Sequence, residues 1–169
     1  VDDINGWDAY SNDGSIPSDN HGTHVAGTIG AKGNNNSDVV GVNWNVKIMS
    51  VAGSSGSTST ISLAYGYILD QKSLWLSSNG EFGANVVATN SSFGVDNANC
   101  NSGSYPVWND LYDAMGQVGI LSAAATTNSN TSVSLSKNFL ILLKSKFKNF
   151  ILKKHEGRSP HENKFYFRL

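Results

Sequence analysis

Short apolar runs and longer periodic segments alternate along the first 130 residues. Three short runs, rich in β-branched residues and followed by small or polar ones, predict inner strands at residues 46–52, 85–90 and 119–125. A helix with one apolar face is predicted in each interval between them. The order strand, helix, strand, helix, strand predicts an α/β fold with right-handed crossovers on a parallel sheet.

The two predicted helices begin differently. The first has Ser59 or Thr60 as its cap, and its apolar face is spaced at i, i+3, i+4, i+7 and i+8, which gives Ile61, Ala64, Tyr65, Ile68 and Leu69. The second opens at Pro106, a residue favoured in the first turn, and its apolar face is Val107, Leu111, Met115 and Val118.

The segment before the first strand is predicted to be a loop followed by a helix. Residues 2–20, rich in Asp, Asn, Ser and Gly, are expected to form an irregular surface loop. Residues 24–31 are small and apolar, which predicts a buried helix that is entered through Asn20 and Gly22 and ends near Gly33.

The loops that follow the strands are where we expect chemistry. In parallel sheets the ligand crevice lies beyond the carboxyl ends of the strands. The loops at 53–57, 90–94 and 126–130 are therefore expected to share one rim.

Composition and charge divide the chain near Leu135. Its 169 residues, 39% of them apolar, suffice for one globular domain with a core. Residues 1–135 hold three basic and eleven acidic side chains, whereas residues 136–169 hold nine basic and two acidic ones. We expect a folded domain at 1–135 and a basic low-complexity tail at 136–169 outside that fold. The formal charge of −1 excludes a nucleic-acid binder that depends on bulk positive charge.

The basic tail has several possible origins. Its Lys and apolar residues suit a membrane-surface helix, but at about 100° per residue Lys144 and Lys154 share a face with Leu140 and Phe147. The sudden Lys, Phe, Leu and Asn bias favours translation of an AT-rich intron or a shifted frame over a native tail. The longest apolar run, residues 139–143, is too short to cross a bilayer. Together with the lysines on the apolar face, this means that membrane association is not expected.

The most informative sequence motif in the chain is Asn20-His21-Gly22-Thr23-His24-Val25-Ala26-Gly27. A histidine at the mouth of a helix, followed by Gly, can present its imidazole to a crevice as a general base. The word closely resembles the histidine motif of the subtilisin-like serine proteases, in which the first histidine is the base and the second packs inside the helix. The resemblance covers roughly residues 1–134. It implies a truncated doubly wound parallel sheet, with His21 as the catalytic base.

A zinc site is the alternative for the two histidines, because His21 and His24 lie at i and i+3. No third ligand supports it, and Gly22-Thr23 stands where H-E-x-x-H has its glutamate. Cys100, the single cysteine, excludes both an intrachain disulfide and a cysteine-built zinc site.

Two further segments resemble the family's substrate-binding edges, although composition alone makes them equally good surface loops. In the first, Ser55, Gly56 and Ser57 would offer backbone groups to an extended polypeptide substrate. In the second, Ser92, Phe93 and Gly94 would line the primary specificity pocket.

The strand at 119–125 leads to the residue that the resemblance assigns to the oxyanion. A side-chain amide there would stabilise the negative oxygen of the tetrahedral intermediate. The family usually has Gly-Asn after the alanines, whereas this chain has Thr126-Thr127-Asn128. Asn128 is therefore the choice and Asn130 the alternative, with an ordinary polar turn as the third reading.

The Asn-rich loop after the first helix occupies the place of a calcium loop in several members of the family. By that resemblance Asn35 is the side-chain ligand, with the carbonyls of Gly33, Ser37 and Val39. The upstream aspartate that completes such a site cannot be placed, so an ordinary Asn-rich turn is the favoured alternative. The chemistry itself requires no cofactor.

The resemblance predicts a serine endopeptidase, but two of its motifs are missing. No D-T-G or D-S-G word follows an apolar strand, and G-T-S-x-A-x-P does not occur. Asp2 and Asp3 start the chain and lie too near His21 to serve. The chain alone is therefore expected to be inactive, and the alternative is a non-catalytic fragment or pseudoenzyme that binds extended peptides. The family implies an extracellular or secretory protein, although the 169 residues contain no signal peptide. The oligomeric state is left open.

Overall fold

The computed structural model describes residues 6–36, 38–54, 57–95, 103–125 and 128. They form a mixed α/β fold with parallel strands, and the elements in chain order are β1 (Gly6–Asp8), α1 (Asn20–Gly30), β2 (Ser50–Ala52), α2 (Thr58–Ser77), β3 (Ala88–Ser91), α3 (Pro106–Gln117) and β4 (Leu121–Ala124). The predicted boundary at Leu135 lies outside the described residues.

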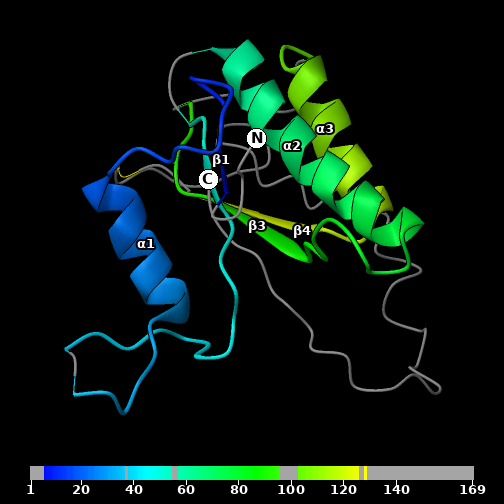
Figure 1. Cartoon of the computed structure of the whole chain (residues 1–169). Coiled ribbons are helices and arrows are strands. Elements are labelled where there is room, and N and C mark those ends of the chain that lie inside the picture. The colour runs from blue at the N-terminus through cyan, green and yellow to red at the C-terminus, as the bar shows by residue number, and fades with distance from the viewer. Residues whose placement is uncertain (1–5, 37, 55–56, 96–102, 126–127, 129–169) are drawn as a thin grey trace.

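The strands pair as two short parallel ladders (Figure 1). One joins β1 to β2, with Trp7 opposite Val51, and the other joins β3 to β4, with Ser91 opposite Ala124. The prediction that all of residues 2–20 are irregular is wrong, since β1 lies within them. Three residues are too few to show the period-two pattern that identifies a strand.

The predicted first strand is also too long. Residues 46–49 are not in a strand, and β2 is limited to Ser50–Ala52. A ladder can be no longer than its shorter partner, and β1 has three residues.

Helices α2 and α3 lie side by side over β3 and β4, and α1 stands apart from them (Figure 1). The predicted face of α2 is confirmed for the four buried residues Ile61, Ala64, Tyr65 and Ile68, while Leu69 is half-buried against the core. The cap is Ser57 rather than Ser59 or Thr60, because the Ser57 hydroxyl accepts the backbone N–H of Thr60 at 3.2 Å.

The buried face of α3 differs from the predicted one. Trp108, Tyr112 and Met115 are buried, and of these only Met115 was expected. Val107 is 47% exposed. The helix is turned by about one position because its two large amphipathic rings bury more surface than the aliphatic residues and also find polar partners.

The expectation that α1 is buried is wrong for the described structure. Gly22 alone among its residues is buried, and the helix ends at Gly30 rather than near Gly33. The chain then returns along it, with the N–H of Gly41 donating to the carbonyl of Ala31 at 2.8 Å. A Cβ at Gly41 would collide with the backbone of Ala31 and Gly30, which explains the glycine. In the part of the chain that the structure describes, no helix combines the length and apolar character needed to cross a membrane.

Candidate active site

His21 lies in the first turn of α1, and the residue before the helix fixes this turn. The carboxylate of Asp19 accepts a hydrogen bond from the backbone N–H of Gly22. The carbonyl of Asp19 also accepts the N–H and the hydroxyl of Thr23, at 3.0 and 2.7 Å. These bonds satisfy backbone donors at the helix start. They therefore fix the backbone of the first turn, from which the exposed His21 side chain projects.

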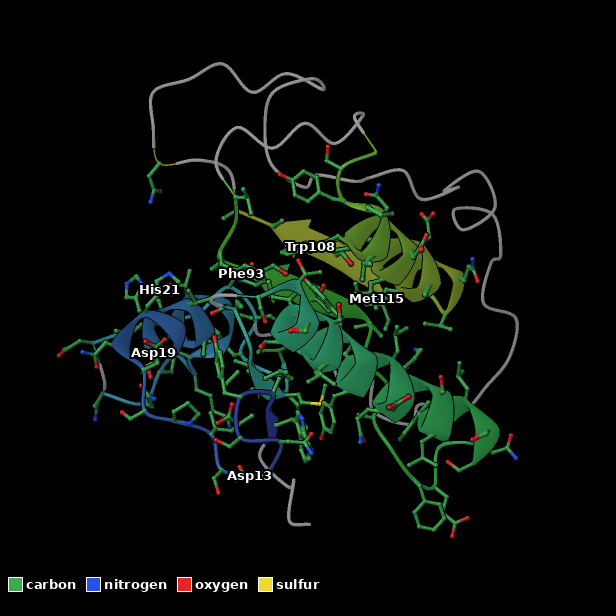
Figure 2. The ribbon with its side chains drawn as sticks, turned by 90° about the horizontal axis from the view of Figure 1, so that it is seen from above. Asp13, Asp19, His21, Phe93, Trp108 and Met115 are labelled. Carbon is green, nitrogen blue, oxygen red and sulfur yellow. The ribbon has the colours of Figure 1, made fainter. Side chains whose placement is uncertain are left out.

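A cavity of about 290 Å³ opens beside this helix start. Its volume lies near the lower end of ligand pockets, roughly 300–1,000 Å³. Residues from three distant parts of the chain line it: Tyr10, Ile16, Pro17, Asp19, His21 and Gly22; Ser50, Val51, Ala52, Gly53 and Ser54; Ser92 and Phe93. Figure 2 shows His21 at the end of α1 with Phe93 nearby. The loops after β2 and β3 therefore line one cavity together with His21, as expected. The third loop expected at this rim, 126–130, lies outside the described residues except for Asn128, which does not line the cavity.

The loop after β3 is held by contacts on both sides. The carbonyl of Ser91 accepts the N–H of Ala125 at 2.9 Å, and the amide of Asn90 donates to the Ser92 hydroxyl at 2.8 Å. The Phe93 ring lies 6.3 Å from the buried ring of Trp108. These contacts place Ser92 and Phe93 in the cavity wall.

The loop after β2 comes close to α2. A Cβ on Gly53 would lie 2.7 Å from the Cβ of Ala64, so the buried glycine lets the backbone pass against the helix. Ser54 lines the cavity, and Ser57 caps α2 from an exposed position. Ser55 and Gly56 lie outside the described residues.

The remaining predicted site residues are not part of the cavity lining. Gly94 and Asn128 are exposed and do not line it. Asn130, the alternative for the oxyanion, lies outside the described residues. His24 is exposed on α1 rather than packed inside a core, and its carbonyl accepts the hydroxyl of Thr28 at 3.0 Å.

The Asn-rich loop after α1 is the segment for which a calcium ion was expected. Asn35 is exposed, and its neighbours Asn34 and Asn36 adopt left-handed backbone, with φ of 56° and 57°. Calcium takes about six to eight oxygen ligands. One amide oxygen with the carbonyls of Gly33 and Val39 falls short of that number, and Ser37 is outside the described residues. Within the described segments no group of three or more His, Cys, Asp or Glu is placed to hold a metal ion.

Sequence reasoning missed several residues of the cavity. Asp19 could have been found, because Asp is a preferred N-cap and stands directly before the predicted start of the helix at Asn20. Tyr10, Ile16 and Pro17 carry no such signal. Their positions depend on the pairing of β1 with β2, which the sequence did not predict.

Comparison with known proteins gives one family. The sequence model of the subtilase family matches residues 1–151, so the match extends beyond Leu135 into the basic segment. Among the curated relatives is the subtilisin-like protease 1 of Plasmodium falciparum, from isolates 3D7 and NF54, each 54% identical over 50 residues. That alignment covers 29% of this chain and spans 7% of the length of those relatives. No solved structure matches the chain significantly.

Proposed function

Because the chain belongs to the subtilase family, a family of serine endopeptidases, we propose that its cavity binds an extended polypeptide for peptide-bond hydrolysis, with His21 as the general base. The shared lining is the observation that carries this proposal. His21 faces the same cavity as Gly53 and Ser54 after β2 and Ser92 and Phe93 after β3. An extended peptide between two such edges can bond to the main chain of either and place a side chain in the cavity.

In the proposed reaction the imidazole of His21 takes the proton of an attacking hydroxyl and returns it to the leaving amine. The amide of Asn128 is proposed to donate to the developing oxyanion. An aspartate must orient the imidazole and a serine must attack. Neither family motif for these two residues occurs among the 169 residues. This chain alone is therefore proposed to bind peptides without turning them over.

The second candidate is a non-catalytic peptide binder, a fragment or pseudoenzyme with the same cavity. The missing serine and aspartate motifs favour it, since loss of triad members leaves only residual catalysis. Both candidates predict that this chain binds peptides, and they differ in whether hydrolysis follows once the missing serine and aspartate are supplied.

Two further proposals rest on the family alone. We propose that the Asn35 loop binds a structural calcium ion, and that the protein works in an extracellular or secretory setting.

A peptide titration with separate readouts tests the function. Two extended peptides, one with a large apolar side chain and one with alanine at the position that enters the cavity, are titrated into wild type, Phe93→Ala and His24→Ala. Product release is followed by mass spectrometry. We expect saturable binding that Phe93→Ala weakens and His24→Ala leaves unchanged, because His24 does not line the cavity. Absence of peptide binding to wild type would contradict the proposal. Hydrolysis of a bound peptide would show that this chain supplies its own nucleophile.

A further inference from the structure

Three hydroxyl groups form a chain of hydrogen bonds inside the fold, behind the wall of the cavity. The hydroxyl of Tyr65 on α2 lies 2.7 Å from the Ser91 hydroxyl on β3 and 2.7 Å from the Tyr112 hydroxyl on α3. The two tyrosine rings meet edge to face, with centroids 5.3 Å apart. One buried hydroxyl thus joins two helices to the end of a strand.

Burial indicates the direction of these bonds. Tyr65 and Ser91 are 0% and 1% exposed, whereas Tyr112 is 8% exposed. If Ser91 donates to Tyr65 and Tyr65 donates to Tyr112, both deeply buried hydroxyl hydrogens have acceptors. The last hydrogen then belongs to Tyr112, the most exposed of the three. The reverse order would leave it on Ser91, where burial makes an unmet hydrogen bond costly.

Burial also keeps the two tyrosines protonated. It raises the pKa of Tyr65 well above its usual value of 10.0, and the neighbouring Tyr112 raises it further. The pKa of Tyr112 is raised by burial as well. The chain of hydroxyls is therefore neutral over the ordinary pH range, and its role is directional bonding rather than charge.

Ser91 is the point where this network meets the candidate site. It is the last residue of β3, and the next two residues, Ser92 and Phe93, line the cavity. Its carbonyl holds Ala125, just beyond β4, at 2.9 Å. The side chain of Ser91 is thus bonded to the helical layer while its main chain is bonded to the neighbouring strand.

We propose that Tyr65, held by Tyr112, is a positioning residue for the peptide-binding edge at Ser92–Phe93. The hydrogen bond from Ser91 fixes the position of the end of β3 relative to α2. It thereby determines how far Phe93, two residues later, reaches into the cavity. An apolar contact would hold the same helix and strand together without specifying their relative position, because apolar contacts are non-directional. Satisfied buried polar networks instead favour one arrangement. This inference rests on the proposed peptide binding.

The test compares Tyr65→Phe, Tyr112→Phe and the double variant Tyr65→Phe/Ser91→Ala. Tyr67→Phe is the matched control, since Tyr67 is on the same helix but stacks on Trp7 at 5.2 Å. Each variant is assayed for urea unfolding, for amide exchange at residues 92–94, and for the affinity ratio between peptides with an apolar and an alanine side chain at the cavity.

Tyr65→Phe is expected to lower the apolar-to-alanine affinity ratio about fivefold, the factor equivalent to one lost hydrogen bond, and to speed exchange at residues 92–94. Tyr112→Phe is expected to act in the same direction but less, and Tyr67→Phe to leave the ratio unchanged. Adding Ser91→Ala to Tyr65→Phe should recover stability, because it removes the stranded hydroxyl, without restoring the ratio.

The outcomes separate this inference from the proposed function. If wild type binds peptides and Tyr65→Phe changes stability but neither the affinity ratio nor the exchange at 92–94, the network is purely structural and the inference is wrong. If wild type binds no peptide, the proposed function fails. The exchange comparison then still decides whether Tyr65 positions the edge.

Discussion

The carboxylate of Asp19 accepts the backbone N–H of Gly22, and this bond sets the start of the helix on which His21 lies. Asp19→Ala removes the cap and is expected to lower the free energy of unfolding by about 1 kcal/mol. It should also weaken peptide binding, because both His21 and Gly22 line the cavity. Urea unfolding and peptide titration of the same samples measure the two effects.

Asp19→Asn is the matched control, since Asn caps helices as well as Asp does. It should keep both stability and affinity near those of wild type. If Asp19→Asn is as damaging as Asp19→Ala, the charge rather than the cap matters, and this account of the helix start is wrong.

A buried lysine predicts a pH dependence of stability. Lys72 is 6% exposed and its Nζ donates to Oδ1 of Asn85 at 2.6 Å. Burial lowers the pKa of Lys72 from 10.5, so the folded chain releases this proton at a lower pH than the unfolded chain does. Between the lowered pKa and 10.5 the unfolded state binds more protons, and the stability of the fold therefore rises with pH in that window.

Lys72→Met is expected to remove this rise, whereas Lys47→Met, at an exposed lysine, should keep it. Urea unfolding from about pH 7 to about pH 10 measures the slope, and the difference between wild type and Lys72→Met isolates the lysine, because the tyrosines, whose usual pKa is 10.0, contribute equally to both. Equal slopes in wild type and Lys72→Met would show that Lys72 does not titrate in this way.

Calcium tests the Asn-rich loop. A ligand that binds only the folded state raises the unfolding midpoint by mass action. If the loop at Asn35 binds the ion, added calcium should raise the midpoint of wild type and raise it less in Asn35→Ala. No shift at millimolar calcium would remove the site.

A fluorophosphonate probe tests whether the chain carries an activated serine. Because the family's serine motif is absent, we expect no stoichiometric labelling at a single residue. Stoichiometric labelling that His21→Ala abolishes would overturn the expectation and would assign His21 as the base of a nucleophile not recognised in the sequence.

The sequence predicted the elements better than their exact contacts. Helix α2 was predictable because Ile61, Ala64, Tyr65 and Ile68 repeat at the helical period, and all four are buried. The inner face of α3 was not, since Trp108 and Tyr112 combine burial with hydrogen bonds that periodicity does not register. The pairing of β1 with β2 depends on contacts between residues more than 40 positions apart, which no local pattern reveals.

The residues of the candidate site likewise divide into those with a local sequence signal and those without one. His21, Ser92 and Phe93 were proposed from short words that resemble a family, and the three line one cavity. The contribution of Tyr10 and Pro17 to that lining could not be read from a loop without periodicity. The hydroxyl of Tyr65 was hidden for another reason, because a tyrosine on an apolar face is indistinguishable in sequence from a purely apolar core residue.

The central claim is that an extended peptide occupies the cavity beside His21, and the imidazole resonances of His21 and His24 test it most directly. Both side chains are exposed on the same helix, three residues apart, but only His21 lines the cavity. The two resonances are assigned with His21→Ala and His24→Ala. We predict that the chemical shift of His21 changes during peptide titration until it saturates, with the same midpoint as the binding curve. The chemical shift of His24 is predicted to stay unchanged. A peptide that binds while both signals move alike, or while neither moves, would contradict the account.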